Sequence, residues 1–303
     1  MGETLTALVG ERFAAGLSLP EQDADLERLV AALTARFGDR LQAVILYGSY
    51  TRGARDSLVD LYALLDRYRG TELAAWHGPA CALLAPNVYH LALDDGLRCK
   101  YAMLPLDQFT RALQRDFHSY FWARFAQPSS LLYVAAPHIA SRLIDGLAAA
   151  TGRMLDEGVR GAREALTPTA LWQRALAATY RCELRAERGN RATELAQSSA
   201  DHLGALALAH AQAAGWDVTD GKLSGWDASG GWRWPLRRAW GKLLSVLRLI
   251  KAAATFNDGF EYLLWKIERH SGIYVEPNRW QRRAPLLFAW PLFWRLYRLG
   301  AFR

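Results

Sequence analysis

Two stretches of sequence predict the fold of this chain: Leu46-Tyr47-Gly48-Ser49, and after it Leu58-Val59-Asp60-Leu61-Tyr62-Ala63-Leu64-Leu65-Asp66. The apolar runs before Gly48 and around Asp60 are typical of two buried strands. A glycine between them lets backbone amides come close to an anion, and the serine hydroxyl and the start of a following helix add donors. Asp60 offers an oxygen ligand for Mg²⁺, which usually bridges to substrate phosphates. The pattern indicates either a nucleoside triphosphate site or an ordinary turn between strands with an aspartate at the edge.

The residues at this turn resemble the nucleotidyltransferase superfamily, whose signature is Gly-Ser, a spacer and then Asp-x-Asp. Tyr47-Gly48-Ser49 matches the first half, whereas Leu58 stands where the first of the two aspartates would be. One branch is similar to this chain at that point, namely the mitochondrial-type phosphatidate cytidylyltransferases of the translocator assembly and maintenance family. Its second strand reads two apolar residues, Asp, an apolar run and a second Asp, and residues 58–66 follow that order.

Further motifs of that family follow in order, so that the resemblance covers residues 40 to 135. They are Trp76-His77, Pro86 with Tyr89, the turn Asp94-Asp95-Gly96, Lys100-Tyr101, and the aromatic stretch from Tyr120 to Pro128 that contains Arg124. Two departures stand out. Tyr50 replaces the glycine that the family has at its third position, and the C-terminal region is richer in tryptophan and arginine.

The resemblance implies a nucleotidyltransferase that joins CTP to phosphatidic acid and makes CDP-diacylglycerol and pyrophosphate, with Mg²⁺ as its cofactor. It implies Asp60 as a catalytic residue and the main metal ligand, and Lys100 as a catalytic ammonium that meets phosphates. The alternative is a lysine in mid-strand that points to solvent from a half-buried sheet. The expected nucleotide-binding residues are Tyr47, Gly48, Ser49 and Arg52. Because phosphatidate is already anionic near neutral pH, positioning and charge neutralisation suffice without a strong general base.

The second aspartate of the strand, Asp66, receives a different interpretation. Along an extended strand it lies roughly 20 Å from Asp60, which is too far for the two carboxylates to share one metal ion. We therefore interpret Asp66 as a residue of the turn that ends the strand.

The composition favours a folded chain with anionic partners. Of 303 residues, 51% are hydrophobic, which is ample for a core. The net charge of +7 favours nucleotides, anionic lipids or nucleic acid as partners. Cys81, Cys99 and Cys182 lack paired spacing, which favours buried thiols in a reducing compartment over a metal or redox site. The N-terminus has no long apolar run, so neither a signal peptide nor a transit peptide is expected.

The pattern of elements predicts an α+β nucleotidyltransferase-like domain over residues 1–136, an all-helical domain over 137–275 and a tail over 276–303. The first domain is expected to hold a mixed sheet. Its expected strands span residues 42–47, 59–65, 88–93, 97–104 and 131–134, and its expected helices 23–37, 71–84, 106–116 and 118–126. The helical domain is expected to contain segments near 138–158, 168–188, 191–213, 235–254 and 258–270.

The basic, aromatic tail predicts a membrane-interface segment. Its apolar core spans residues 284–294, and a spanning helix needs about 20 residues. The residues expected to contact lipid are Arg282, Arg283, Trp290, Trp294, Arg295 and Arg298. A strap packed on the helical domain is the alternative. The expected location is the cytoplasmic face of a membrane, as a peripheral protein of a bacterial cytoplasm.

Three functions stay open on the sequence. The first is CTP-dependent phosphatidate cytidylyl transfer, and the second is nucleotidyl transfer to another phosphate or hydroxyl acceptor. The third is binding of nucleotide or anionic lipid without catalysis, because Leu58 removes one metal aspartate. A nucleic-acid enzyme is disfavoured, because the basic residues gather in a tail with large apolar side chains rather than along a groove-sized face.

Overall fold

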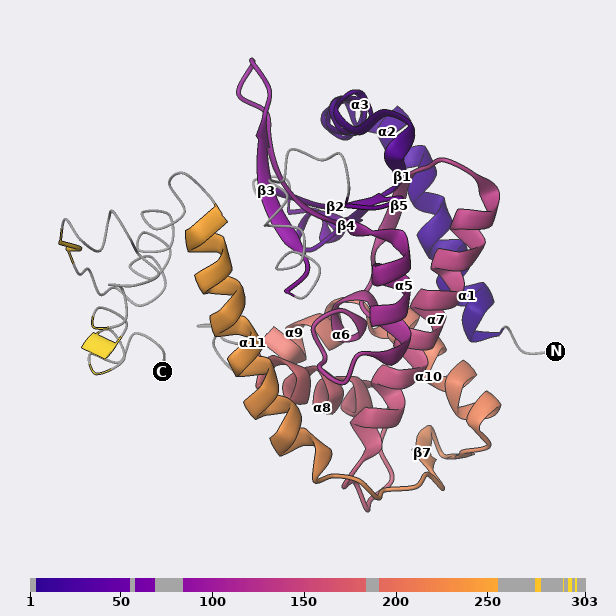
Figure 1. Cartoon of the computed structure of the whole chain (residues 1–303). Coiled ribbons are helices and arrows are strands. Elements are labelled where there is room, and N and C mark those ends of the chain that lie inside the picture. Colours follow the sequence, from indigo (N-terminus) through magenta and orange to yellow (C-terminus); the bar gives the residue numbers. More distant parts are fainter. Residues whose placement is uncertain are drawn as a thin grey trace.

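The chain folds as an α+β protein with a mixed five-stranded sheet and helices on both of its faces (Figure 1). The computed structural model describes residues 4–54, 58–68, 84–183, 191–255 and 276–278, and the single residues Pro291, Trp294, Arg295 and Arg298. The expected fold class is confirmed at this level. The expected helices near 71–84 and 258–270 lie outside the described residues, apart from Leu84.

The sheet has the strand order β3-β4-β2-β1-β5. Its strands are β1 (Leu41–Tyr47), β2 (Val59–Leu65), β3 (Asn87–Ala92), β4 (Arg98–Pro105) and β5 (Ser130–Val134). β2 and β4 run parallel, whereas the other neighbours run antiparallel. The five strands that the sequence predicts are confirmed, and the expected turn Asp94-Asp95-Gly96 joins β3 to β4.

Each face of the sheet has its own apolar cluster, because side chains alternate between the two faces of a strand. α3 (Ala24–Phe37) covers one face with Leu26, Leu29 and Leu33. The other face is covered by α5 (Leu106–Arg115), α6 (Trp122–Phe125) and α7 (Pro137–Val159) (Figure 1). Asp60 and Lys100 lie on this second face, since they alternate in step with Tyr62 and Ala102 of its cluster.

The second half of the described chain is mainly helical. After α7 come α8 (Pro168–Tyr180), α9 (Arg191–Ser198), α10 (Ala200–Ala214) and α11 (Arg233–Thr255). The sequence predicts one helix over 191–213, which is wrong: Ser199, with φ −134° and ψ 32°, interrupts it and separates α9 from α10. A short hairpin of β6 (Asp217–Thr219) and β7 (Lys222–Ser224) was not predicted, because strands of three residues carry too little periodicity to be recognised.

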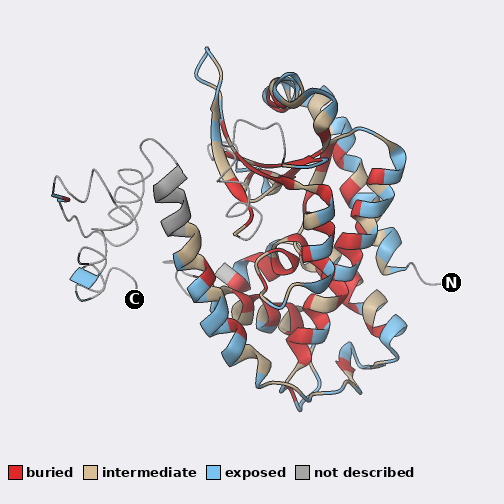
Figure 2. Cartoon of the chain, in the orientation of Figure 1, coloured by how far each residue is buried: buried red, intermediate tan, exposed pale blue. Residues whose placement is uncertain are grey.

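One buried cluster connects the sheet to the helices. At the N-terminus, α1 (Leu5–Ala14), η1 (Ala15–Ser18) and α2 (Leu19–Gln22) precede α3. α1 packs against α7 and α10. The apolar cluster under the sheet continues to Trp172 of α8 and Leu203 of α10 (Figure 2). The expected division of the chain at residues 136 and 137 stays a prediction.

A buried ion pair fixes α11 to α7. Arg237 is fully buried, and its guanidinium donates to both carboxylate oxygens of Glu157, with Nη2 2.7 Å from Oε1. Its Nε also donates to the carbonyl of Phe117 at 2.8 Å. Burial raises the pKa of Glu157, but the hydrogen bonds and charge of Arg237 outweigh it and hold that pKa below its usual value. Because a buried charge is costly unless it is paired, this contact strongly favours the observed position of α11.

The cysteines that the structure describes are buried free thiols, as expected from their spacing. Cys99 lies in β4 and Cys182 follows α8. Burial, and after it the charge of Asp60, raises the pKa of Cys99 to about 12, so that its thiol stays protonated and unreactive near neutral pH. Cys81 lies outside the described residues.

Candidate functional site

A row of polar side chains crosses the sheet near the end of β1. Tyr47 of β1 lies opposite Asp60 of β2, and Asp60 lies beside Lys100 of β4. Lys100 in turn lies opposite His90 of the edge strand β3. Partners in register share a face of the sheet. The strand order therefore brings together four residues that are spread over residues 47 to 100 of the chain.

The centre of this row is an ion pair between Asp60 and Lys100. Nζ of Lys100 lies 3.1 Å from Oδ1 of Asp60, and the side chains are 31% and 26% exposed, respectively. The ammonium is thus turned toward the carboxylate rather than spread into solvent. Both groups remain accessible to a ligand, and partial burial leaves their charges less screened than on an open surface.

The backbone at Gly48 lies close to the carboxylate of Asp60. Its φ of +88° lies in the left-handed region that favours glycine. A Cβ added at this position would lie 3.0 Å from Oδ2 of Asp60. The absence of a side chain therefore leaves room beside the oxygen of Asp60 that faces away from the ion pair. The approach of the Gly48 backbone to phosphate oxygens, which the sequence predicts, stays a prediction.

The other expected nucleotide-binding residues lie on the turn after β1. Ser49 precedes the single 3₁₀ turn η3 (Tyr50–Arg52), which Thr51 braces by donating from Oγ1 to the carbonyl of Gly48 at 2.8 Å. Arg52 is exposed at the end of this turn. The structure therefore brings Tyr47, Gly48, Asp60 and Lys100 together and holds Ser49 and Arg52 on the adjoining turn.

Tyr50, which replaces a glycine of the family pattern, is buried and turned toward α3. Its hydroxyl donates to Oδ2 of Asp23 at 2.8 Å. The other oxygen of Asp23 accepts hydrogen bonds from the first backbone amides of α3. The departure from the family pattern therefore ties the turn to the start of α3.

Beside Tyr47, an arginine joins the row to the helices. Arg124 of α6 donates from Nη1 to the hydroxyl of Tyr62 at 3.3 Å and to that of Tyr120 at 2.9 Å. Its guanidinium carbon also lies 5.6 Å from the ring centroid of Tyr47. An ion pair of 3.8 Å joins Nη2 of Arg124 to Glu183. The spacing of Tyr120 and Arg124, four residues apart, predicts that the two side chains either line a cytidine or lipid pocket or simply pack, and the structure brings them into contact.

A second guanidinium reaches the same tyrosine from α11. The guanidinium carbon of Arg248 lies 4.1 Å from the ring centroid of Tyr120. Its Nε donates to the carbonyl of Ala85 at 2.9 Å, across 163 residues of sequence. In the sequence, Arg248 and Lys251 share a helix face that indicates a solvated surface, with an anion pocket facing the sheet as the alternative.

This cluster holds two guanidinium groups, and the carboxylate of Glu183 pairs with one of them, that of Arg124. Burial raises the pKa of Tyr62 far above its usual value. For Tyr120 burial acts in the same direction, but the charges of Arg124 and Arg248 outweigh it and lower the pKa. His118 has a pKa lowered to about 4 by burial and by Arg248, so it is neutral near pH 7. A region of this kind, set beside Asp60 and Lys100, suits an anionic group.

The residues present fit Mg²⁺ if a bound triphosphate completes its coordination. Within the described ranges no group of three or more His, Cys, Asp or Glu residues could hold a metal ion by itself. Mg²⁺ in phosphate sites is usually held by one or two carboxylates, with phosphate oxygens and waters as further ligands. Asp60 offers one carboxylate, and Gly48 leaves space beside its Oδ2. Asp60 would therefore hold the ion together with the nucleotide.

The residues that flank β2 at its two ends have different surroundings. Asp66, at the end away from the row, pairs with Nε of Arg40 at 3.3 Å and accepts from the amide of Arg67 at 2.7 Å. This agrees with its interpretation as a residue of the turn. At the other end, Leu58 is 43% exposed where the superfamily pattern has an aspartate. The site therefore has one carboxylate at the position where two are usual.

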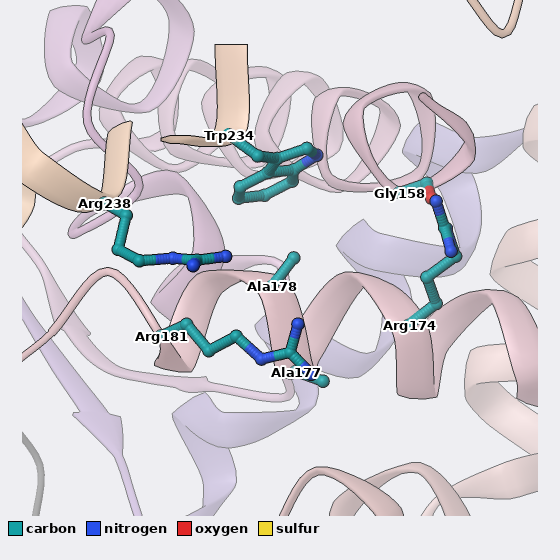
Figure 3. A pocket seen from close by; sticks show the side chains of 7 residues that line it. All are labelled: Gly158, Arg174, Ala177, Ala178, Arg181, Trp234 and Arg238. Carbon is teal, nitrogen blue, oxygen red and sulfur yellow. The ribbon is translucent and has the colours of Figure 1, made fainter. Parts of the chain in front are cut away.

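A separate cavity lies between α7, α8 and α11. It has a volume of about 220 Å³ and is lined by Gly158, Arg174, Ala177, Ala178, Arg181, Trp234 and Arg238 (Figure 3). Arg174 donates to the carbonyls of Gly158 and Arg160 at 2.9 and 3.0 Å. None of these lining residues belongs to the row on the sheet, so the cavity is distinct from the Asp60 site.

The lipid-contact residues that the sequence predicts lie in the tail. Arg282, Arg283 and Trp290 lie outside the described residues, as do Trp76 and His77. Trp294, Arg295 and Arg298 are exposed. In the described part of the chain, no helix is both long and apolar enough to cross a bilayer.

No protein-family model matches this chain, and no curated protein matches it.

Proposed function

We propose that the protein transfers the cytidylyl group of CTP to the phosphate of phosphatidic acid at a membrane surface. An oxygen of the lipid phosphate forms a bond to the α-phosphorus of CTP while the bond between the α- and β-phosphates breaks. The products are CDP-diacylglycerol and pyrophosphate. The observation that carries the proposal is the Asp60–Lys100 pair, 3.1 Å apart, under the close turn at Gly48.

In this proposal the row on the sheet holds the nucleotide. Gly48 and Ser49 offer backbone amides to the triphosphate, and Lys100 supplies a fixed positive charge for its oxygens. Asp60 holds Mg²⁺, and Lys100 keeps its carboxylate oriented through the ion pair. When bound, Mg²⁺ neutralises triphosphate charge and makes the α-phosphorus more electrophilic.

The cationic cluster supports an acceptor that is itself a phosphate. Arg124 and Arg248 gather around Tyr120, and Tyr47 connects them to Asp60. A phosphate monoester is already anionic near neutral pH and can attack without losing a proton to a strong base. Positioning and charge neutralisation by the two arginines are therefore the help that such an acceptor needs.

Pyrophosphate release tests the proposal. The full chain is incubated with each of the four nucleoside triphosphates and Mg²⁺, with and without phosphatidic acid in mixed micelles. We expect release from CTP that depends on phosphatidic acid. Release from CTP that depends instead on another phosphate or hydroxyl compound would retain nucleotidyl transfer and reject the lipid acceptor.

Binding of CTP without turnover is the second candidate, and the exposed Leu58 favours it, because one of the two usual metal carboxylates is missing there. Titration calorimetry with CTP and Mg²⁺ distinguishes the two. Binding that Asp60→Asn weakens, with no pyrophosphate released on any acceptor, would favour this second function over catalysis.

A further inference from the structure

The outward face of α11 carries a stripe of large apolar side chains. Leu236, Trp240 and Leu243 of this helix are 52%, 47% and 48% exposed, and Trp232, in the turn just before the helix, is 67% exposed. The spacing of three or four residues places Leu236, Trp240 and Leu243 on one side of the helix, and the exposed Val246 extends the stripe by one more turn. Single exposed apolar residues are ordinary on protein surfaces. A continuous stripe that contains Trp240, with Trp232 exposed just before it, indicates an interaction surface.

The opposite face of the same helix is firmly packed. Arg237 is buried in its pair with Glu157, and Leu244 is buried in the core. Gly241 lies so close to the carbonyl of Cys182 that a side chain there would collide with it. Figure 2 shows this contrast as buried residues on the inner side of α11 and exposed ones on its outer side. The helix therefore cannot turn its apolar stripe inward without losing these contacts.

The charges of α11 have a single sign. The cations in its sequence are Arg233, Arg237, Arg238, Lys242, Arg248 and Lys251, and it contains no aspartate or glutamate. Arg237 and Arg248 are used inside the protein and Arg238 lines the cavity between α7, α8 and α11, whereas Lys242 is exposed at the edge of the stripe near Val246. An exposed apolar stripe on a helix whose charges are all positive is complementary to a surface with an apolar interior and anionic groups at its boundary.

We propose that this face of α11 lies on the surface of an anionic phospholipid bilayer. Tryptophan rings favour the level of the headgroups, leucine side chains enter the acyl boundary, and exposed cations of the helix meet lipid phosphates. A second copy of the chain is a poorer occupant. A twofold contact through this stripe would set the cations of one α11 against those of the other.

This surface differs from the tail over residues 276–303 that the sequence indicates, and it does not depend on the proposed reaction. It also lies on the helix that carries Arg248 into the candidate site. Docking through α11 would therefore hold the site at a fixed position relative to the bilayer.

Co-sedimentation with vesicles tests the proposal on the full chain, without nucleotide. The vesicles contain phosphatidylcholine either alone or with phosphatidylglycerol. We expect binding to the anionic vesicles, and Trp240→Ser with Leu243→Ser should weaken it by about tenfold or more. The matched control is Leu208→Ser with Val218→Ser, which removes two exposed apolar side chains elsewhere and should bind like the original chain. Binding of the α11 variant within about twofold of the original would overturn the proposal.

Two further measurements test the role of the cations and distinguish bilayer binding from self-association. Replacing Arg238 and Lys242 by glutamate should weaken binding by about tenfold or more, since each basic residue near an anionic surface contributes. The same change at Arg111 and Arg115, exposed on α5, should have a smaller effect. Sedimentation velocity addresses self-association. One result would overturn the bilayer proposal: the original chain dimerises, and the variant with Trp240→Ser and Leu243→Ser is monomeric but binds vesicles as before. The stripe would then be an interface between two copies of the chain.

Discussion

Nζ of Lys100 lies 3.1 Å from Oδ1 of Asp60, and the two residues are direct neighbours on the parallel strands β2 and β4. Both strands lie in the middle of the sheet, so the backbone holds this pair on both sides. The ammonium can therefore keep its place when a phosphate binds beside it. Preorganised charge of this kind is what phosphoryl-group chemistry requires, because a fixed charge needs no rearrangement during the reaction.

The first prediction concerns the charge of Lys100. Lys100→Met keeps the length and apolar stem of the side chain and removes the ammonium. If this charge meets a phosphate in the transition state, we expect turnover to fall by about 100-fold or more. Thermal unfolding should change little, because the side chain is partly exposed. Lys222→Met, at an exposed lysine of β7, is the control. A Lys100→Met variant that retains turnover within a few-fold would argue against a catalytic role.

The second prediction separates backbone strain from closeness to the carboxylate. Gly48 and Gly53 have nearly the same conformation, with φ of +88° and +85°. A Cβ at Gly48 would lie 3.0 Å from Oδ2 of Asp60, whereas a Cβ at Gly53 would have nothing within 4 Å. Alanine at either position should cost about 1–2 kcal/mol of unfolding free energy from the left-handed backbone. Only Gly48→Ala should also lose nucleotide binding, measured by calorimetry with CTP and Mg²⁺. Equal loss of binding in both variants would contradict the assigned role of Gly48.

The third prediction assigns Arg248 to the acceptor rather than to the nucleotide. Arg248→Met removes a guanidinium that stacks on Tyr120 while leaving α11 anchored by Arg237. We expect the KM for phosphatidic acid in mixed micelles to rise about tenfold, as for the loss of one charge-assisted contact. The KM for CTP should change little. Arg153→Met, which removes another partly buried arginine from its stack on Trp122, is the control. A rise in the KM for CTP alone would place Arg248 at the nucleotide instead.

The fourth prediction concerns stability and pH. Glu157→Gln breaks the buried pair with Arg237 and should lower the free energy of unfolding at pH 7 by about 3–5 kcal/mol. The folded state holds the pKa of Glu157 below its usual value of 4.5, so the stabilisation exists above that value and is lost as the pH falls through the lower folded-state pKa. Urea unfolding at a series of pH values checks this. The difference in unfolding free energy between the original chain and Glu157→Gln should become smaller below pH 4.5. A difference that stays constant down to pH 3 would contradict the stabilising role of the ionised Glu157.

Much of the sheet could be predicted because its strands carry their own pattern. The apolar runs around Val44 and Leu61 are long enough to define β1 and β2, and both were found correctly. The pairing of β2 with β4 could not be read from local periodicity. It depends on which strands become neighbours, and it is this pairing that sets Lys100 beside Asp60. Residues of the site that lie on one turn or one strand, such as Gly48 and Asp60, could be predicted from the sequence, whereas their neighbours on other strands could not.

The parts of the site that come from packing were not predictable from the sequence. Arg248 reaches Tyr120 because the buried pair of Arg237 and Glu157 fixes the position of α11. No residue near Arg248 in the sequence indicates this. The same packing exposes Trp240 and Leu243, whereas a helical pattern alone does not say which apolar face stays uncovered.

Transfer of label from CTP into lipid tests the proposed function most directly. The full chain is incubated with CTP labelled in its α-phosphate, Mg²⁺ and phosphatidic acid, and the lipid fraction is analysed. We predict that label enters the lipid as CDP-diacylglycerol with one pyrophosphate released for each transfer. Asp60→Asn should abolish the transfer, while Asp66→Asn, at the far end of the same strand, should preserve it. A folded chain that leaves the lipid unlabelled, or an Asp60→Asn variant that labels it as well as the original chain, would contradict the proposal.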